Sequence, residues 1–148
     1  ENVDVSRSDI LLYGFSIGTV PATELAANAD MDGCLGLVLE APVGSAEIYA
    51  QDATYLPLPD SFLTEYDLDN ASKIKDVQTK LLWLHGTEDS MNKYDTHGQA
   101  VYDNHGGTEK YKKIVEGAQH SDIPRVLGSD FSVYIKGITD FAGGSVPF

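Results

Sequence analysis

The sequence predicts an α/β fold in which a parallel β-sheet is flanked by helices. Short apolar runs, each closed by glycine or proline, alternate with longer segments whose apolar residues recur at helical spacing. A run of four or five apolar residues is typical of a strand buried on both faces of a parallel sheet. Strands that alternate with helices are typical of the right-handed crossovers that build such sheets. The 148 residues are enough for one domain over positions 1–148.

Four segments fit the strand pattern and four fit the helix pattern. The predicted strands are Ile10–Tyr13, Leu35–Leu39, Leu81–Leu84 and Tyr111–Val115. The predicted helices are Ile17–Ala29, Asn70–Val77, Thr96–Asn104 and Phe131–Phe141. In the first helix we expect Val20 and Leu25 to face the core and Thr23 to face outward. The last helix has apolar residues at positions i, i+3, i+4, i+7 and i+10, which indicates an amphipathic helix.

Residues 43–70 interrupt this alternation. They hold aromatic and apolar side chains among acidic ones, including Tyr49, Tyr55 and Leu58. An insertion placed over the carboxyl ends of the strands would form a lid, and its apolar residues would then contact a substrate. The alternative is a surface excursion with a small apolar contact of its own.

Composition excludes several classes of function. Ten Lys and Arg against 23 Asp and Glu give a formal net charge of −13, which disfavours a nucleic-acid partner. No apolar run approaches the ~18 residues of a membrane span. The single cysteine, Cys34, is expected to be a small buried residue, and it excludes a cysteine-cluster metal site. The segment 28–33 resembles the start of a calcium loop, but the twelfth position is Leu39 instead of glutamate. We therefore expect neither a metal nor a cofactor.

The segment Gly14-Phe15-Ser16-Ile17-Gly18 matches G-x-S-x-G between a predicted strand and a predicted helix. A serine hydroxyl is a weak nucleophile and has to project from a tight turn to reach a carbonyl. We expect both glycines to be required because the turn leaves no room for side chains. The backbone N–H of Ile17, at the helix start, is the candidate oxyanion donor. Phe15 lies beside the serine and is a candidate substrate contact.

A nucleophilic serine needs a histidine base and an acid that orients it. His120 follows the fourth predicted strand and Asp89 follows the third, so both belong to the same sheet edge as Ser16. The chain order Ser, Asp, His is that of α/β-hydrolases. Glu40, which ends the second strand, is an alternative acid for which a structural role is favoured.

The other three histidines are given structural or surface roles. We expect His85 to support a turn at the end of the third strand. His97 and His105 lie on or beside a polar helix and are expected to be solvated.

Four segments together carry a resemblance to a known family: residues 13–21, 39–42, 84–89 and 115–122. They resemble the α/β-hydrolase superfamily, in particular the branch of α/β-hydrolase domain-containing proteins 17 and 13 and the BEM46-like proteins. The resemblance covers about residues 8–141. It implies an α/β-hydrolase fold with Ser16 as nucleophile, Asp89 as acid and His120 as base. It implies cleavage of an ester or thioester, with a serine peptidase as the alternative.

The sequence departs from this resemblance in two places. After Asp89 the family usually has a hydrophobic residue and proline, whereas this chain has Ser90-Met91-Asn92-Lys93, so Asp95 is a second candidate acid. The half of the family fold that carries the other oxyanion donor would precede Ser8. The strand Ile10–Tyr13, which has no charge or proline to protect an edge, is therefore expected to pair with an N-terminal hydrolase segment or a second subunit. The alternative function is a non-catalytic or partner-dependent subunit.

Overall fold

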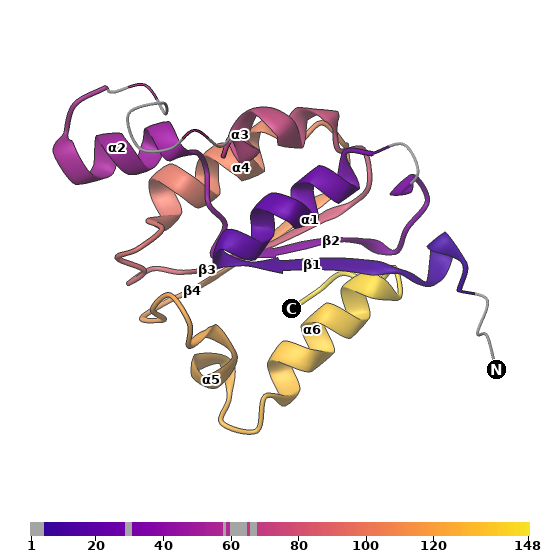
Figure 1. The fold of residues 1–148 in the computed structure, drawn as a ribbon. Helices are drawn as coiled ribbons and strands as arrows, with labels where there is room; N and C mark the ends of the chain where they lie inside the picture. The colour runs from indigo at the N-terminus through magenta and orange to yellow at the C-terminus, as the bar shows by residue number, and fades with distance from the viewer. Residues whose placement is uncertain (1–4, 29–30, 58, 60–64, 66–67) are drawn as a thin grey trace.

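A four-stranded parallel sheet forms the centre of the molecule (Figure 1). The computed structural model describes residues 5–28, 31–57, 59, 65 and 68–148. The strands lie in the order β1-β2-β3-β4. Their bounds are Leu11–Phe15 for β1, Gly36–Glu40 for β2, Leu81–Gly86 for β3 and Lys110–Val115 for β4. The predicted α/β fold with a parallel sheet is confirmed.

Helices cover both faces of the sheet. Their bounds are Thr19–Ala26 for α1, Ala46–Thr54 for α2, Asn70–Lys73 for α3, Gln99–Asn104 for α4, Ile123–Leu127 for α5 and Ser132–Ala142 for α6. Figure 1 shows α1, α3 and α4 on one face and α5 and α6 on the other, while α2 extends beyond the carboxyl ends of the strands. Among the described residues no helix has the length and apolar character needed to cross a membrane.

Alternate side chains of the inner strands build two cores, one on each face. Leu37 and Leu39 of β2 point to the face covered by α1, whereas Val38 between them packs near Phe141 of α6. All three β2 side chains are completely buried, as the continuous apolar run predicts. Burying one such side chain is worth about 1.5–3 kcal/mol, so the middle of the sheet is its most stable part.

The first strand continues further than predicted. Gly14 was expected to close it, but β1 runs to Phe15, which pairs with Glu40 of β2. The strand position of Gly14 requires glycine because α1 crosses directly over it: an added Cβ would lie 2.7 Å from the carbonyl oxygen of Gly18. This close approach brings the start of α1 to the end of β1.

The same close approach overturns the predicted face of α1. Thr23 is completely buried, while Leu25 is 53% exposed. The helix buries its small residues, since only these fit the short distance to the sheet. The buried residues of α1 are Thr19, Ala22, Thr23 and Ala26.

Other helices differ from their predicted bounds. The segment predicted as one helix over Thr96–Asn104 is a wide turn, Tyr94–Gly98, followed by α4. Helix α6 buries Phe141 but leaves Ile135 exposed, so only part of its predicted apolar face reaches the core. Helix α5 was not predicted. Its five residues, with a proline in the first turn, are too few to show a period.

Candidate active site

Ser16 lies at the tight turn between β1 and α1. Its φ is 52°, in the left-handed region that residues with a Cβ rarely adopt. The turn is held by the hydroxyl of Thr19, which donates to the carbonyl oxygen of Ser16 at 2.6 Å. Gly14 has no room for a side chain, as expected. At Gly18, however, an added Cβ would meet no atom of the described residues within 4 Å, so the second glycine is not required by space.

Thr19 is fixed by groups from two distant segments, which sequence reasoning missed. Its buried hydroxyl also accepts from the backbone N–H of Val43 and from Nδ2 of Asn70, both at 3.2 Å. The Asn70 amide donates to the carbonyl oxygen of Val43 as well, at 2.9 Å. These contacts tie the serine turn to the residues after β2 and to the start of α3. No local pattern in the sequence indicates such a long-range connection.

The structure brings Ser16, His120 and Asp89 into one hydrogen-bonded line. Nε2 of His120 lies 2.8 Å from Oγ of Ser16, and Nδ1 lies 2.8 Å from Oδ2 of Asp89. A carboxylate accepts hydrogen bonds, so Nδ1 carries the proton and Nε2 accepts from the serine hydroxyl. Proton transfer from Ser16 to His120 therefore needs no rearrangement of this line.

Asp89 is buried at the end of β3 and accepts several hydrogen bonds. The backbone N–H groups of Met91 and Asn92 donate to its Oδ1, each at 2.9 Å. Burial alone would raise the pKa of Asp89, but hydrogen bonds from His85, His120 and the Asn92 N–H outweigh it and lower the pKa to about 2. The side chain is therefore a carboxylate at neutral pH, as an imidazole-orienting acid has to be.

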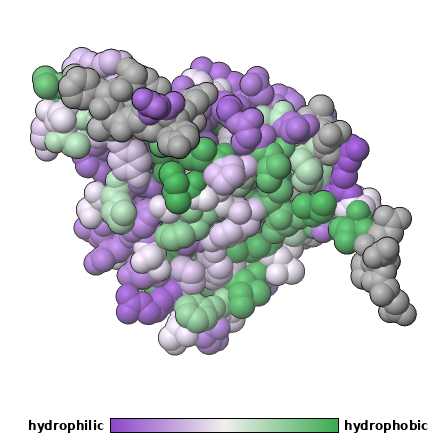
Figure 2. All heavy atoms as spheres, in the orientation of Figure 1, coloured by the Kyte–Doolittle hydropathy of each residue, from purple (hydrophilic) through white to green (hydrophobic). Residues whose placement is uncertain are grey.

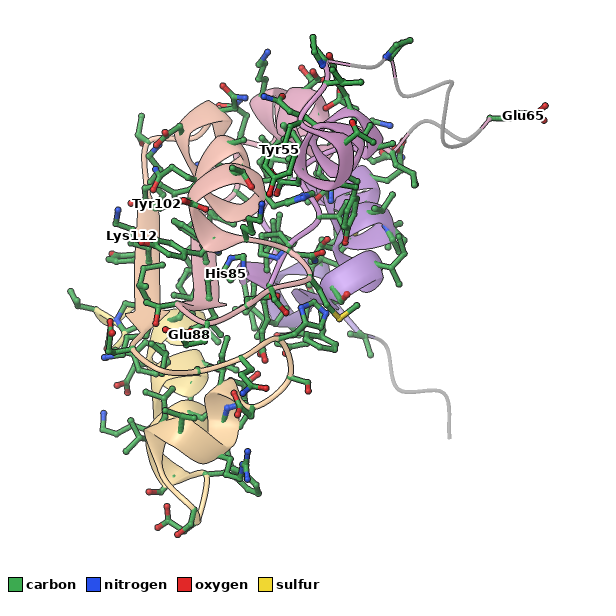
Figure 3. The ribbon with its side chains drawn as sticks, turned by 90° about the vertical axis from the view of Figure 1, so that its left-hand side faces the viewer. Tyr55, Glu65, His85, Glu88, Tyr102 and Lys112 are labelled. Atoms are coloured by element: carbon green, nitrogen blue, oxygen red, sulfur yellow. The ribbon has the colours of Figure 1, made fainter. Side chains whose placement is uncertain are left out.

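His85, near the end of β3, is completely buried inside the molecule (Figure 3). Its Nδ1 accepts from the indole N–H of Trp83 at 2.9 Å, so Nε2 carries the proton. That Nε2 donates to the carbonyl oxygen of Asn92 at 2.6 Å and lies 3.2 Å from Oδ2 of Asp89. The predicted turn-supporting role is thus only part of what His85 does, because it also contacts the candidate acid.

Backbone hydrogen bonds join the loops that carry Asp89 and His120. The N–H of Glu88 donates to the carbonyl oxygen of Ala118 at 2.9 Å, and the N–H of Gly117 donates to Oγ1 of Thr87 at 2.9 Å. Gly86 lies so close that an added Cβ would be 2.1 Å from the Ala118 carbonyl oxygen. The two loops therefore form one unit, which fixes the distance between acid and histidine.

The two alternative acids lie elsewhere. Asp95 is exposed in the turn before α4. Glu40 is buried at the end of β2, where its Oε2 accepts from the hydroxyls of Tyr13 and Tyr134, each at 2.6 Å. Burial and the hydrogen bond to Glu40 raise the pKa of both tyrosines. Glu40 thus connects β1 to α6, in line with the structural role favoured for it.

The candidate substrate contacts are placed differently from one another. The Phe15 ring lies 5.2 Å from the imidazole of His120. Tyr49 is partly buried on α2, whereas Tyr55 is 86% exposed at the far end of that helix (Figure 3). Leu58 lies outside the described residues. A cavity of about 150 Å³ between α2 and the loop after β3 is lined by Tyr49, Asp52, Ala53, Ser90, Met91 and Lys93.

His97 and His105 are not solvated, so that expectation is wrong. His97 is completely buried: its Nδ1 accepts from the backbone N–H of Gly44 at 3.0 Å, and its ring lies 4.4 Å from that of Tyr49. His105 is also buried, and its Nε2 donates to the carbonyl oxygen of Thr79 at 2.9 Å. Their partners come from segments distant in sequence, so the polar helix pattern alone was misleading.

Within the described ranges no group of three or more His, Cys, Asp or Glu side chains is arranged to hold a metal ion. Cys34 is buried, as predicted for a small core residue.

Comparison with known proteins gives relatives over nearly the whole chain, although no family model matches it. The chain is 32% identical over 146 residues to alpha/beta hydrolase domain-containing protein 17C of Mus musculus, spanning 97% of this chain and 40% of that protein. It is also 32% identical over 127 residues to protein 17B of Homo sapiens, spanning 80% of this chain and 38% of that protein. The chain thus spans about two fifths of the length of these curated relatives.

Solved structures agree with this result at the level of the fold. The Pyrococcus furiosus esterase has a TM-score of 0.67 at 17% identity, covering 93% of this chain and 53% of that one. The acylaminoacyl peptidase of Pyrococcus horikoshii has a TM-score of 0.64 at 18% identity, covering 93% of this chain and 25% of that one. The chain is thus similar to α/β-hydrolase domain-containing proteins over nearly its whole length, and it has the α/β-hydrolase fold. The fold and the resemblance inferred from the sequence are confirmed.

Proposed function

We propose that this chain is the catalytic part of a serine hydrolase that cleaves carboxylic ester or thioester bonds through an acyl-enzyme. The observation that carries the proposal is the hydrogen-bonded line from Ser16 through His120 to Asp89. The strained backbone of Ser16 supports it, because such conformations concentrate at functional sites. The names of the relatives and structural neighbours support a hydrolase but not a particular bond.

The proposed reaction proceeds in two halves. His120 takes the proton of Ser16 through Nε2 while Oγ attacks the substrate carbonyl carbon, and Asp89 stabilises the imidazolium. The imidazolium then gives its proton to the departing alcohol or thiol, which leaves an acyl group on Oγ. A water molecule, deprotonated by His120, attacks this acyl group, and the proton returns to Oγ as the acid departs. No oxidant or cofactor is needed.

The N–H of Ile17 is the proposed oxyanion donor in this chain. It directly follows Ser16, at the start of the turn that leads into α1. We assign the second donor to another polypeptide segment. Loss of one oxyanion donor typically costs about 10²–10³ in rate, so full activity requires that segment.

Residues 43–70 are the proposed lid, with α2 as its described helix. The proposed substrate contacts are Phe15 beside His120, Tyr49 on α2, Tyr55 directly after α2, and Leu58, which lies outside the described residues. The cavity of about 150 Å³ beside α2 suits a small acyl or alcohol group.

A pairing segment for β1 is also proposed. Among the residues that the structure describes, β1 is an edge strand of the sheet. Beside it lie exposed apolar side chains, and Figure 2 shows apolar side chains over α1 and along the β1 side of the molecule. Those of β1, the Ser16 turn and α1 are Tyr13, Phe15, Ile17 and Leu25. An exposed apolar edge strand is an aggregation hazard, so we expect an N-terminal hydrolase segment or a second subunit to cover it.

The proposal is tested by labelling the natively expressed protein, purified as it occurs in its natural source, with a fluorophosphonate. The intact mass is then measured and the modified peptide is identified. We expect one adduct on Ser16, lost in Ser16→Ala and His120→Ala. Ser72→Ala, which changes an exposed serine on α3, is the matched control and should label like wild type. A wild-type protein without an adduct would favour the non-catalytic subunit. Hydrolysis of a peptide anilide without ester or thioester cleavage would favour the peptidase.

A further inference from the structure

Asn92, three residues after Asp89, is completely buried and all four of its polar atoms have partners. Its backbone N–H donates to Oδ1 of Asp89 and its carbonyl oxygen accepts from Nε2 of His85. Its side-chain Nδ2 donates to the carbonyl oxygen of Ala41 at 2.7 Å. Its Oδ1 accepts from the hydroxyl of Tyr49 on α2. Such complete pairing of a buried amide fixes its position and its orientation.

These contacts join four parts of the site at one residue. Ala41, directly after β2, has a φ of 46° and is held in that unusual conformation at the carbonyl that Asn92 binds. His85 ends β3, Asp89 is the candidate acid, and Tyr49 belongs to the proposed lid. A movement of α2 that breaks the hydrogen bond between Tyr49 and Asn92 would therefore also affect the position of the loop that carries Asp89.

We propose that Asn92 is a positioning residue for Asp89 and that the Tyr49 hydroxyl holds Asn92 in place. The position of α2 is thereby linked to the orientation of the Asp89 carboxylate toward His120. This inference rests on the catalytic role proposed for Asp89. It assigns Tyr49 a function through its hydroxyl, while its ring lines the cavity beside α2.

The protonation state of Tyr49 is consistent with its role as a hydrogen-bond donor to Asn92. Burial raises the pKa of Tyr49, and the nearby charge of Asp89 adds to the effect, so the hydroxyl keeps its proton. Its ring packs against the buried ring of His97. Tyr49→Phe therefore removes the hydrogen bond to Asn92 and leaves the ring packing in place.

The test compares Tyr49→Phe, Asn92→Ala and the double variant in the natively expressed protein. Tyr111→Phe is the matched control, because it removes a tyrosine hydroxyl that bonds Glu109 on the surface at 3.1 Å. Four quantities are measured: kcat and KM for the ester or thioester that the enzyme cleaves, cooperative thermal unfolding, and the downfield proton NMR signal of the His120 Nδ1–H that bonds Asp89. The NMR signal reports the hydrogen bond between Asp89 and His120 and does not require turnover of a substrate.

We expect kcat to fall about 10-fold in Tyr49→Phe and about 100-fold in Asn92→Ala, with KM unchanged, because small misplacements at a catalytic group cost rates of this order. The imidazole proton signal should move in both variants and not in Tyr111→Phe. Tyr49→Phe should have no further effect in the Asn92→Ala background, because it acts through Asn92.

The inference is overturned if both variants keep the wild-type imidazole signal, whatever happens to their stability. Independent effects in the double variant would overturn the link to Tyr49. A wild-type protein that shows the signal but neither turnover nor a Ser16 adduct would refute the proposed function alone, and the NMR comparison would still decide whether Asn92 positions Asp89.

Discussion

Ser16 is held in a backbone conformation that costs a residue with a Cβ about 1–2 kcal/mol, with φ at 52°. The hydroxyl of Thr19, itself bound by Val43 and Asn70, offsets this cost by fixing the carbonyl of Ser16. The backbone of the turn is thus strained at Ser16, while hydrogen bonds through Thr19 hold it in place. This arrangement aims the serine hydroxyl at His120 before any substrate binds.

The two glycines of the serine motif give a matched pair for testing this turn. Gly14→Ala places a Cβ against the backbone of Gly18 and Thr19, and such overpacking typically costs about 1–3 kcal/mol. Gly18→Ala points into open space among the described residues and has a helical φ of −62°. We expect urea unfolding to show a clear loss of stability in the first variant and no loss in the second.

The same comparison bears on catalysis. Gly18→Ala should retain fluorophosphonate labelling of Ser16, while Gly14→Ala should label slowly because α1 is displaced. Equal stability and equal labelling of the two variants would show that α1 does not depend on the close approach at Gly14.

At this scale the sequence was informative for residues whose chemistry has a local pattern. That Ser16, His120 and Asp89 lie together could be predicted, because each follows a strand and their order is that of a known fold. Thr19 and Asn92 were missed, because their roles come from hydrogen bonds to segments more than twenty residues away. A single sequence carries no signal for such contacts.

At the scale of elements, the buried His97 connects the turn before α4 to the residues that lead into α2. Its Nδ1 accepts from the Gly44 N–H, and its ring lies against the Tyr49 ring at a tilt of 56°. Burial lowers the pKa of His97 from 6.5 to about 4, although the nearby carboxylate of Asp52 opposes the shift. The folded protein thus keeps His97 neutral where the unfolded chain is protonated.

This difference predicts a pH dependence of stability. Below pH 6.5 the unfolded chain binds a proton at position 97 that the folded protein does not, so the free energy of unfolding should fall as the pH drops from about 6.5 to 4. The full effect is on the order of 3 kcal/mol, because a tenfold difference in proton affinity is worth about 1.4 kcal/mol. Urea unfolding of wild type and His97→Gln at several pH values measures it.

We expect the His97→Gln curve to be flatter than that of wild type over this range, since the carboxylates titrate in both proteins alike. Parallel curves would contradict the buried, neutral state of His97.

Helices and strands could be predicted where burial follows average hydropathy, but not where it depends on contacts with particular residues. All four strands were found, and the two inner ones, β2 and β3, are buried along their whole length and mostly apolar. The face of α1 was wrong, since its close contact with Gly14 selects Thr and Ala over Leu. The polar helix that carries His97 was read as solvated for the same reason: specific partners, not average hydropathy, decide its burial.

At the scale of the whole molecule, the two edges of the sheet differ. β4 carries Lys110, Lys112 and Lys113, and the Lys112 ammonium lies 5.3 Å from the centre of the Tyr102 ring (Figure 3). Lysines on an edge strand discourage pairing with another strand. β1 carries no charge. The contrast supports the proposal that another segment pairs with β1.

Hydrogen exchange tests this proposal. In the natively expressed protein, all amides of β1 should be protected as well as those of β3, and the particle should exceed the 16.0 kDa of this chain. The 148-residue chain expressed alone should exchange part of the β1 amides quickly, with β3 as the internal control. Fast exchange in a native particle of 16.0 kDa would exclude a pairing segment.

The central claim is that Ser16 is a working nucleophile activated by His120 and Asp89, and one measurement tests it most directly. Intact-mass spectrometry after fluorophosphonate treatment should show a single adduct, located on Ser16 and absent from His120→Ala. Undiminished labelling in Ser16→Ala, or no adduct on a folded wild-type protein, would contradict it.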